Sequence, residues 1–193
     1  WEKLENADLF VKYAEKVTKE LGDYADIICT INEANLTSCF AHSFPNYPPD
    51  GIKTFLPFVD EAAKSCGSNV DNFGPFLFGH PYKIRDCMMK AHRKSFPVIK
   101  ENLNNNQSVG ITLSIMDYQC IEGGEQERDK AHAESVDICL DQVKDDDFLG
   151  VQMYTRHTFG PDGIIMPDIN TADMLVMGYE YYPESVENVL RYV

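Results

Sequence analysis

The stretch DIICTINEAN, residues 26–35, joins a run of apolar β-branched residues to an amide and a carboxylate. Its isoleucines suit a strand that is fully buried in a parallel sheet, because the run shows no polar alternation. Asn32 and Glu33 follow at the point where such a strand should end. The carboxyl ends of parallel strands are where α/β folds keep their chemistry. The stretch therefore predicts a strand that delivers Glu33 to a functional surface, and a strand running into an ordinary polar loop is the alternative.

Helices and strands alternate on both sides of this stretch. Apolar residues at helical spacing predict helices over residues 6–22, 84–103, about 126–143 and 182–193. β-Branched runs predict strands over residues 26–31, 109–115 and 148–154. Gly22 is expected to end the first helix in a left-handed conformation, Pro97 to kink or bound the second, and Pro183 to occupy the first position of the last.

This alternation is typical of a right-handed parallel β/α array in an α/β protein. No repeat or linker divides the chain, so residues 1–193 are expected to form a single domain. A complete (β/α)8 TIM barrel takes about 250 residues. With about three parallel strands, this chain is predicted to be a partial TIM barrel that lacks the first and last strands.

A long segment without clear secondary structure separates the first strand from the second helix. It runs from Ser38 to about Gly79, is rich in Pro, Gly, Asn and aromatic residues, and contains one short helical pattern at 55–63. Segments of this length inside a compact domain are uncommon and often functional. A wall or lid over a site and a packing insertion are both compatible with this pattern.

Charge and composition exclude several classes of protein. Lys and Arg number 17 against 31 Asp and Glu, for a net charge of −14, and such a surface repels nucleic acid. The apolar runs are too short to span a membrane, and the N-terminal residues resemble neither a signal peptide nor an anchor. The six cysteines show no zinc-site spacing and are interpreted as reduced thiols. These features predict a cytoplasmic protein that binds neither nucleic acid nor membrane.

Residues at three strand ends, all but one of them polar, are expected to converge on one side of the sheet. They are Asn32 and Glu33, Met116 and Asp117, and Gln152 with Tyr154. A carboxyl group there can donate a proton, while amide and phenol groups orient hydroxyls. The aspartates at 145–147 are interpreted as a solvated turn and the five histidines as surface or packing residues, so that neither a metal nor a cofactor is expected.

Five segments, taken together and in order, resemble one known family. TINEA at 30–34 resembles the motif T-F/L-N-E-P, AH at 91–92 resembles an A-H helix start, and VGITL at 109–113 resembles I-G-I-T-L. Further along, DFLGVQMYT at 147–155 resembles D-F-I-G-V-N-Y-Y-T, and GYEYYPE at 178–184 resembles G-W-E-I-Y-P-E. On these motifs the chain resembles the central part of the family 1 glycoside hydrolases, typified by β-glucosidases.

The resemblance implies a retaining β-glycosidase acting on a β-linked glucoside or a related small saccharide, without a cofactor. Glu33 would be the general acid/base, Asn32 would hold the sugar 2-hydroxyl, and Tyr154 would hydrogen-bond the nucleophile. Asn35 and Gln152 are the further candidates for substrate binding. The family's nucleophile lies in a T-E-N-G motif beyond the position of Val193, so the isolated segment is expected to be inactive and to self-associate through exposed barrel edges.

The chain departs from the family pattern at several positions. Ala34 replaces a proline, Gln152 and Met153 replace Asn and Tyr, and the segment between Cys120 and Asp147 is shorter than the family's usual connection. Two other functions therefore stay open at this point. One is a non-catalytic sugar-binding or scaffold protein built on a partial barrel, and the other is a related barrel glycanase that shares the Asn-Glu motif.

Overall fold

A computed structural model describes residues 1, 3–48, 51, 57–170 and 173–193. Its main sheet contains three parallel strands in the order β1-β2-β4, namely β1 (Ile27–Cys29), β2 (Ser108–Ser114) and β4 (Phe148–Gln152). The predicted α/β class with parallel strands is thereby confirmed. Because all three strands run in one direction, residues 32–33 and 152–154 follow the carboxyl ends of their strands on the same side of the sheet.

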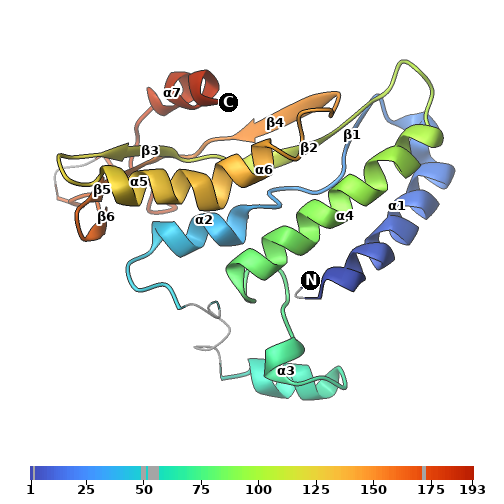
Figure 1. The fold of residues 1–193 in the computed structure, drawn as a ribbon, viewed down its shortest axis with the longest axis horizontal. Coiled ribbons are helices and arrows are strands. Elements are labelled where there is room, and N and C mark those ends of the chain that lie inside the picture. Colours follow the sequence, from blue (N-terminus) through green and yellow to red (C-terminus); the bar gives the residue numbers. More distant parts are fainter. Residues whose placement is uncertain (2, 49–50, 52–56, 171–172) are drawn as a thin grey trace.

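Helices connect these strands and cover the sheet (Figure 1). Helices α1 (Ala7–Leu21) and α4 (Pro81–Glu101) pack side by side, and α2 (Leu36–Ser43) packs on α4. A continuous helical segment follows, made of α5 (Glu125–His132), the π-helical turn η5 (Ala133–Asp137) and α6 (Ile138–Leu140). The last helix, α7 (Ser185–Tyr192), lies next to β3, away from α1 and α4. None of the helices in the described part of the chain is long and apolar enough to cross a membrane.

Strand β2 forms the centre of the hydrophobic core. Its residues Val109, Ile111 and Leu113 are completely buried, because strands flank β2 on both sides and helices cover it. Gly110 is required for the close approach of β4, since a Cβ atom there would lie 2.2 Å from the carbonyl oxygen of Phe148. The central strand therefore holds its neighbours in a fixed register.

A second sheet, which the sequence patterns did not reveal, continues the first. The chain runs on from β2 into β3 (Asp117–Cys120) and from β4 into β5 (Arg156–Gly160). Strands β3 and β5 are parallel, and β6 (Gly163–Ile165) forms an antiparallel hairpin with β5. The chain thus contains two long extended segments that are each interrupted once.

The interruption displaces the register by one residue. Ser114 pairs with Gln152, but Asp117 pairs with Arg156 rather than with Thr155. The β4–β5 segment therefore has one residue more than the β2–β3 segment between the paired positions. A β-bulge has the same kind of extra residue, and it bends the strand and redirects a side chain. Tyr154 lies in this irregular stretch.

Strand β1 corrects the expectation of a fully buried strand. Ile27 is 68% exposed and Cys29 is also exposed, and Ile28 is half-buried. The physical reason is that β1 pairs only with β2 among the described strands, so it lies at the edge of the sheet. A β-branched run predicts an extended backbone, but it does not tell whether a second strand covers the other side.

Two expectations about helix ends are corrected and a third is narrowed. Gly22 has right-handed helical angles, φ −55° and ψ −39°, and begins a 3-10 turn instead of a left-handed stop. Pro97 lies inside α4, which continues to Glu101, so this proline does not mark a helix boundary. Pro183 precedes the N-cap residue Glu184 and is therefore outside α7.

The segment after β1 contains more helix than predicted. Helix α2 was not expected, and the predicted helix at 55–63 corresponds to α3 (Val59–Ser65), with residues 55 and 56 outside the described part. In Figure 1, α3 stands away from the sheet. Helix α2 begins at Leu36, soon after Glu33, and packs on α4, so this part of the segment is a packed helix rather than a loop.

The aspartates at 145–147 are not all in a solvated turn. The Asp146 side chain is 1% exposed and its Oδ2 atom lies 3.0 Å from Nε2 of the completely buried His92. Nδ1 of that ring lies 2.8 Å from the hydroxyl oxygen of Thr30. Asp147 accepts the backbone N–H of Val109 at 2.7 Å. These contacts join β1, α4 and the entry to β4, so the two acidic side chains stabilise the sheet.

Candidate active site

Glu33 follows β1, which ends at Cys29, and has an unusual backbone conformation. Its φ is +51°, in the left-handed region that residues other than glycine rarely adopt. Its N–H donates to the carbonyl oxygen of Thr112 at 3.0 Å and lies 3.1 Å from the hydroxyl oxygen of the same residue. Such conformations persist where the surroundings hold them, and they gather at functional sites. The side chain of Glu33 is consequently aimed across the strand ends and is nine-tenths buried.

Tyr154 donates its hydroxyl proton to the carboxylate of Glu33. The Tyr154 oxygen lies 2.6 Å from Oε1 of Glu33, a distance typical of a strong, charge-assisted hydrogen bond. Burial raises the pKa of Tyr154 to about 12, and the bond to Glu33 and its negative charge add to this effect. The phenol therefore stays protonated over the whole neutral range. The resemblance implied that Tyr154 contacts a nucleophile, whereas here its partner is Glu33.

Asn32 and Gln152 complete a group of four side chains. Oδ1 of Asn32 accepts from Nε2 of Gln152 at 2.9 Å and from the hydroxyl of Thr112 at 3.0 Å. Oε1 of Gln152 lies 3.3 Å from the Tyr154 hydroxyl. The structure thus brings together Asn32, Glu33, Gln152 and Tyr154, as expected from the parallel strand ends. Thr112 is the member that sequence reasoning missed, although it lies within the VGITL motif.

An open, mostly apolar pocket of about 550 Å³ adjoins Glu33. Its walls are formed by Glu33, Leu36, Phe40, Met153, Tyr154, Leu175, Val176, Met177 and Tyr179. Leu36 and Phe40 lie one turn apart on α2, and residues 175–177 belong to the turn closed by the Met174–Glu180 bridge. Among the described residues Glu33 is the sole carboxylate in this lining. The pocket can accept an apolar group next to the carboxyl group of Glu33.

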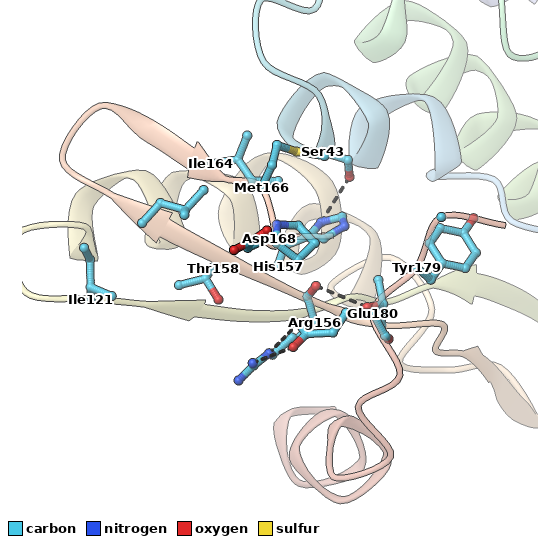
Figure 2. A pocket seen from close by; sticks show the side chains of 14 residues that line it. Ser43, Ile121, Arg156, His157, Thr158, Ile164, Met166, Asp168, Tyr179 and Glu180 are labelled. Carbon is cyan, nitrogen blue, oxygen red and sulfur yellow. Dashed lines mark hydrogen bonds and ion pairs between the residues drawn. The ribbon is translucent and has the colours of Figure 1, made fainter. Parts of the chain in front are cut away.

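A second pocket, of about 490 Å³, lies beyond Tyr179, which lines both cavities. Figure 2 shows Ser43, His157 and Asp168 on one side of it and the Arg156–Glu180 pair on the other. The Arg156 guanidinium is bound to both carboxylate oxygens of Glu180, at 2.7 and 2.8 Å. Burial lowers the pKa of His157 to about 4, so this imidazole is neutral.

Two of the expected site residues, Met116 and Asp117, do not join the group around Glu33. Met116 is buried in the core. The carboxylate of Asp117 accepts from Gln119 and from Asn188 on α7, each at 2.8 Å. Strand β2 ends at Ser114, and Asp117 already belongs to β3, where it pairs with Arg156. The expected position of the strand end was therefore wrong for this strand.

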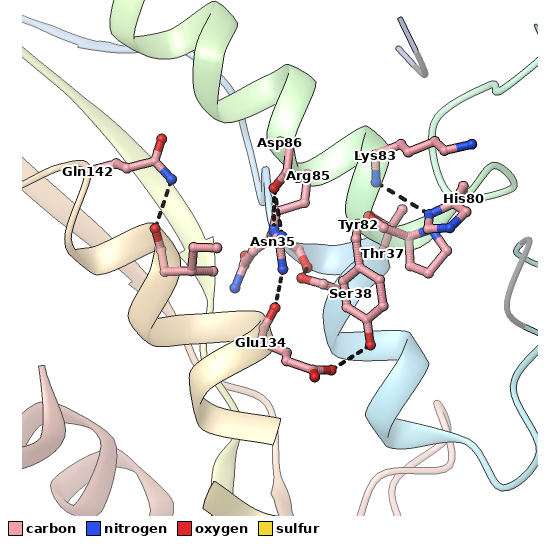
Figure 3. Close-up of polar contacts among 12 residues, drawn as sticks. Asn35, Thr37, Ser38, His80, Tyr82, Lys83, Arg85, Asp86, Glu134 and Gln142 are labelled. Carbon is pink, nitrogen blue, oxygen red and sulfur yellow. Dashed lines mark hydrogen bonds and ion pairs between the residues drawn. The ribbon is translucent and has the colours of Figure 1, made fainter. Parts of the chain in front are cut away.

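Asn35 is placed in the interior and not in a substrate pocket. Its side chain is completely buried, donates to the carbonyl oxygens of Ser114 and Ser135, and accepts the N–H of Ser114 at 2.9 Å. Figure 3 shows it beside Arg85, whose guanidinium contacts the backbone of Glu134. The amide group of Asn35 is therefore hydrogen-bonded within the protein, and Asn35 joins β2, α2 and η5.

The Tyr154–Glu33 bond leads to a testable titration. In Glu33→Gln we expect the pKa of Tyr154 to fall below about 12 but to stay above 10, because the negative charge disappears while burial, the larger cause, remains. NMR of ¹³Cζ-labelled tyrosine measures this, with Tyr154→Phe identifying the signal. An unchanged titration in Glu33→Gln would contradict the assigned hydrogen bond.

Comparison with known proteins shows that the sequence and the fold of the chain are similar to those of glycosidases. The sequence profile described as glycosyl hydrolase family 1 matches residues 1–182. The β-glycosidase BGL167 has a similar structure, with 29% identity, a TM-score of 0.84, and coverage of 100% of this chain and 46% of that chain. The β-glucosidase 1317, solved in its apo form, is 25% identical to this chain, with a TM-score of 0.80. The match covers 99% of this chain and 46% of that chain.

A β-glycosidase from the hyperthermophile Thermosphaera aggregans shares the fold at 19% identity and a TM-score of 0.67, with coverage of 100% of this chain and 41% of that chain. No curated protein sequence matches the chain. The chain spans less than half the length of these solved glycosidases. Together with the parallel β/α arrangement, the matches confirm the prediction of a partial TIM barrel.

Proposed function

The chain belongs to glycosyl hydrolase family 1, and on this basis we propose that it carries the general acid/base of a retaining β-glycosidase, Glu33. The observation that carries the proposal is the hydrogen bond of 2.6 Å between the Tyr154 hydroxyl and the carboxylate of Glu33, beside an open pocket. A protonated Glu33 would give its proton to the glycosidic oxygen. The resulting carboxylate would then take a proton from the water that releases the sugar.

A retaining reaction needs a second carboxylate, about 5 to 5.5 Å from the first. Glu33 is the sole acid in the pocket lining among the described residues, and Asp117 is engaged by Asn188 and Gln119. We therefore assign the nucleophile to sequence outside these 193 residues and expect the 193-residue polypeptide alone to be inactive.

The stereochemistry of the product tests this proposal. A protein that includes these 193 residues and the missing carboxylate should hydrolyse 4-nitrophenyl β-D-glucoside, and ¹H NMR should detect β-glucose before its mutarotation to the α anomer. Release of α-glucose first would show an inverting enzyme, which uses no covalent intermediate. An absence of hydrolysis of β-glycosides would contradict the proposed activity.

The apolar pocket suits the leaving group of the substrate. In the proposed mechanism Glu33 faces the glycosidic oxygen, so the group beyond that oxygen lies next to Glu33. Asn32 and Gln152, which would contact the sugar, are not part of this pocket lining, whereas Leu36, Phe40 and Met153 are. An aryl or alkyl leaving group would cover apolar side chains there, which favours binding by about 25 cal/mol per Å².

We expect Phe40→Ala to weaken discrimination between leaving groups. Loss of an aromatic contact should raise the KM of an aryl β-glucoside by about fivefold to tenfold and leave that of methyl β-glucoside nearly unchanged. Phe58→Ala is the matched control, because Phe58 is 61% exposed and does not line the pocket. Equal effects on both substrates would argue against contact between Phe40 and the leaving group.

We also propose that the 193-residue polypeptide self-associates through the open side of β1. Among the described strands, β1 has a partner on one side only, and Ile27 is 68% exposed. An unpaired strand edge with an exposed isoleucine favours association. Sedimentation velocity should detect dimers or larger species that Ile27→Lys weakens by about tenfold, since a charged edge residue opposes pairing. Ile169→Lys, at a residue that is 75% exposed outside the strands, is the control. A wild-type monomer at all concentrations would contradict this proposal.

A further inference from the structure

The backbone pairing between β1 and β2 continues beyond the end of β1. Thr112 donates its N–H to the carbonyl oxygen of Ile31 at 3.3 Å and accepts the N–H of Glu33 at 3.0 Å. Alternate residues of a strand face the same neighbour, so Ser114 presents the next N–H and C=O on this side of β2. The chain turns away after Glu33, whose carbonyl oxygen accepts the N–H of Leu36 at the start of α2.

The side chain of Asn35 takes the place of a backbone partner for Ser114. Its Oδ1 atom accepts the N–H of Ser114 at 2.9 Å, and its Nδ2 atom donates to the carbonyl oxygen of Ser114 at 2.7 Å. A side-chain amide has the donor and acceptor of a peptide group and a second N–H, which here donates to the carbonyl oxygen of Ser135 at 2.9 Å. The direction of this amide is fixed, because a backbone N–H only donates and a carbonyl oxygen only accepts.

Glu33 therefore lies between two attachments to β2. Thr112 holds its backbone N–H, and Ser114 holds the Asn35 side chain two residues further along. Between these attachments the φ of Glu33 is +51°, and such a conformation persists only where the surroundings over-determine it. The carboxylate of Glu33 must also stay 2.6 Å from the Tyr154 hydroxyl, and displacements of about 0.5 Å already disturb a functional site.

We propose that Asn35 is a positioning residue, which holds the carboxylate of Glu33 at Tyr154 by extending the pairing of β1 and β2 through its side chain. Without this second attachment the backbone of Glu33 is free to relax to right-handed angles, which turns the carboxylate away from Tyr154. Asn35 acts on the reaction only through Glu33. The inference rests on the proposed function for what the carboxylate does, but not for where the carboxylate lies.

The titration of Tyr154 tests this placement without a ligand. In Asn35→Ala we expect the pKa of Tyr154, about 12 in the wild type, to fall by as much as in Glu33→Gln, because the carboxylate leaves the hydroxyl. NMR of ¹³Cζ-labelled tyrosine measures this fall. Thr37→Val is the matched control, since Thr37 is also buried on α2 and its hydroxyl donates to the carbonyl oxygen of Pro81 on α4 at 2.9 Å. A purely structural role would leave the pKa of Tyr154 unchanged in both variants.

A second variant decides the question if Asn35→Ala does not fold. Asn35→Asp retains an acceptor for the N–H of Ser114 but has no proton for the two carbonyl oxygens. Its negative charge by itself would raise the pKa of Tyr154, so a fall can come only from loss of the bond to Glu33. We expect a fall, because Tyr154 bonds directly to Glu33. An unchanged pKa in Asn35→Ala, or a pKa in Asn35→Asp that does not fall, would overturn the proposal.

The wild type offers a measurement that needs no substitution. Each side-chain N–H of Asn35 donates to a carbonyl oxygen in the interior, so both should exchange with water at least tenfold more slowly than those of the exposed Asn105, a factor of about one hydrogen bond. Amide exchange followed by ¹⁵N NMR measures this difference. Equal exchange rates for the two side chains would contradict the pairing of Asn35 with Ser114.

Kinetics then test whether the placement serves the reaction. In a protein that includes the second carboxylate, Asn35→Ala should lower kcat/KM for methyl β-glucoside by at least tenfold and leave that for 2,4-dinitrophenyl β-glucoside nearly unchanged. The reason is that only the poor leaving group needs a proton from Glu33. Equal losses on both substrates would overturn a positioning role for Asn35. If the wild type hydrolysed no β-glycoside, the proposed function would fail, whereas the titration of Tyr154 would still decide the placement of the carboxylate.

Discussion

Replacement of Glu33 by Gln should lower kcat by about 1,000-fold for a β-glycoside with a poor leaving group, because the amide cannot transfer a proton to the glycosidic oxygen. The loss should be much smaller in the first step for 2,4-dinitrophenyl β-glucoside, whose leaving group departs without a proton. The experiment requires a protein that includes the second carboxylate. Steady-state kinetics on the two substrates then measure the two losses. This dependence on the leaving group distinguishes loss of an acid from loss of the fold.

A small anion gives a sharper version of this experiment. Azide should restore turnover of the dinitrophenyl substrate in Glu33→Gln and give the β-glycosyl azide, because azide attacks the glycosyl-enzyme without help from a general base. Glu101→Gln, at an exposed position at the end of α4, should behave as the wild type. Equal losses on both substrates with no azide product would assign Glu33 a role other than acid/base.

The largest loss of stability is expected for Asp146→Ala. The carboxylate of Asp146 is 1% exposed and contacts a histidine that is completely buried. With Nε2–H donating to Asp146, the other ring nitrogen accepts from Thr30, so both positions of His92 are satisfied. Removal of the carboxylate leaves a buried donor without an acceptor and should reduce the free energy of unfolding by about 3 kcal/mol.

The neighbouring residue supplies the control for this experiment. Asp145 is exposed, so that Asp145→Ala should change the free energy of unfolding by about 0.5 kcal/mol or less. Urea denaturation followed by circular dichroism measures both variants. Similar unfolding midpoints for Asp145→Ala and Asp146→Ala would show that the His92 contact contributes little to the sheet.

The sequence was a good guide where a pattern is local. Apolar spacing predicted α1 and α4, β-branched runs predicted β2 and β4, and the ordered motifs indicated family 1, which the comparisons confirmed. It was a poorer guide to burial, because burial depends on which elements lie next to a residue. Ile27 has the sequence character of a core residue and is exposed, whereas Asp146 has the character of a surface residue and is buried.

Glu33 illustrates the division between sequence and tertiary structure. The sequence by itself determined that a carboxylate follows a β-branched strand in an Asn-Glu motif. The order of residues and their local backbone preference depend only on neighbours along the chain, so no tertiary contact is needed to predict them. Only the tertiary structure decided which groups meet it. Tyr154, in the irregular stretch between β4 and β5, donates a hydrogen bond to its carboxylate, whereas Asn35, two residues from Glu33, is buried in the core. Such contacts depend on strand register and packing between segments more than 75 residues apart, on which the local pattern has no influence.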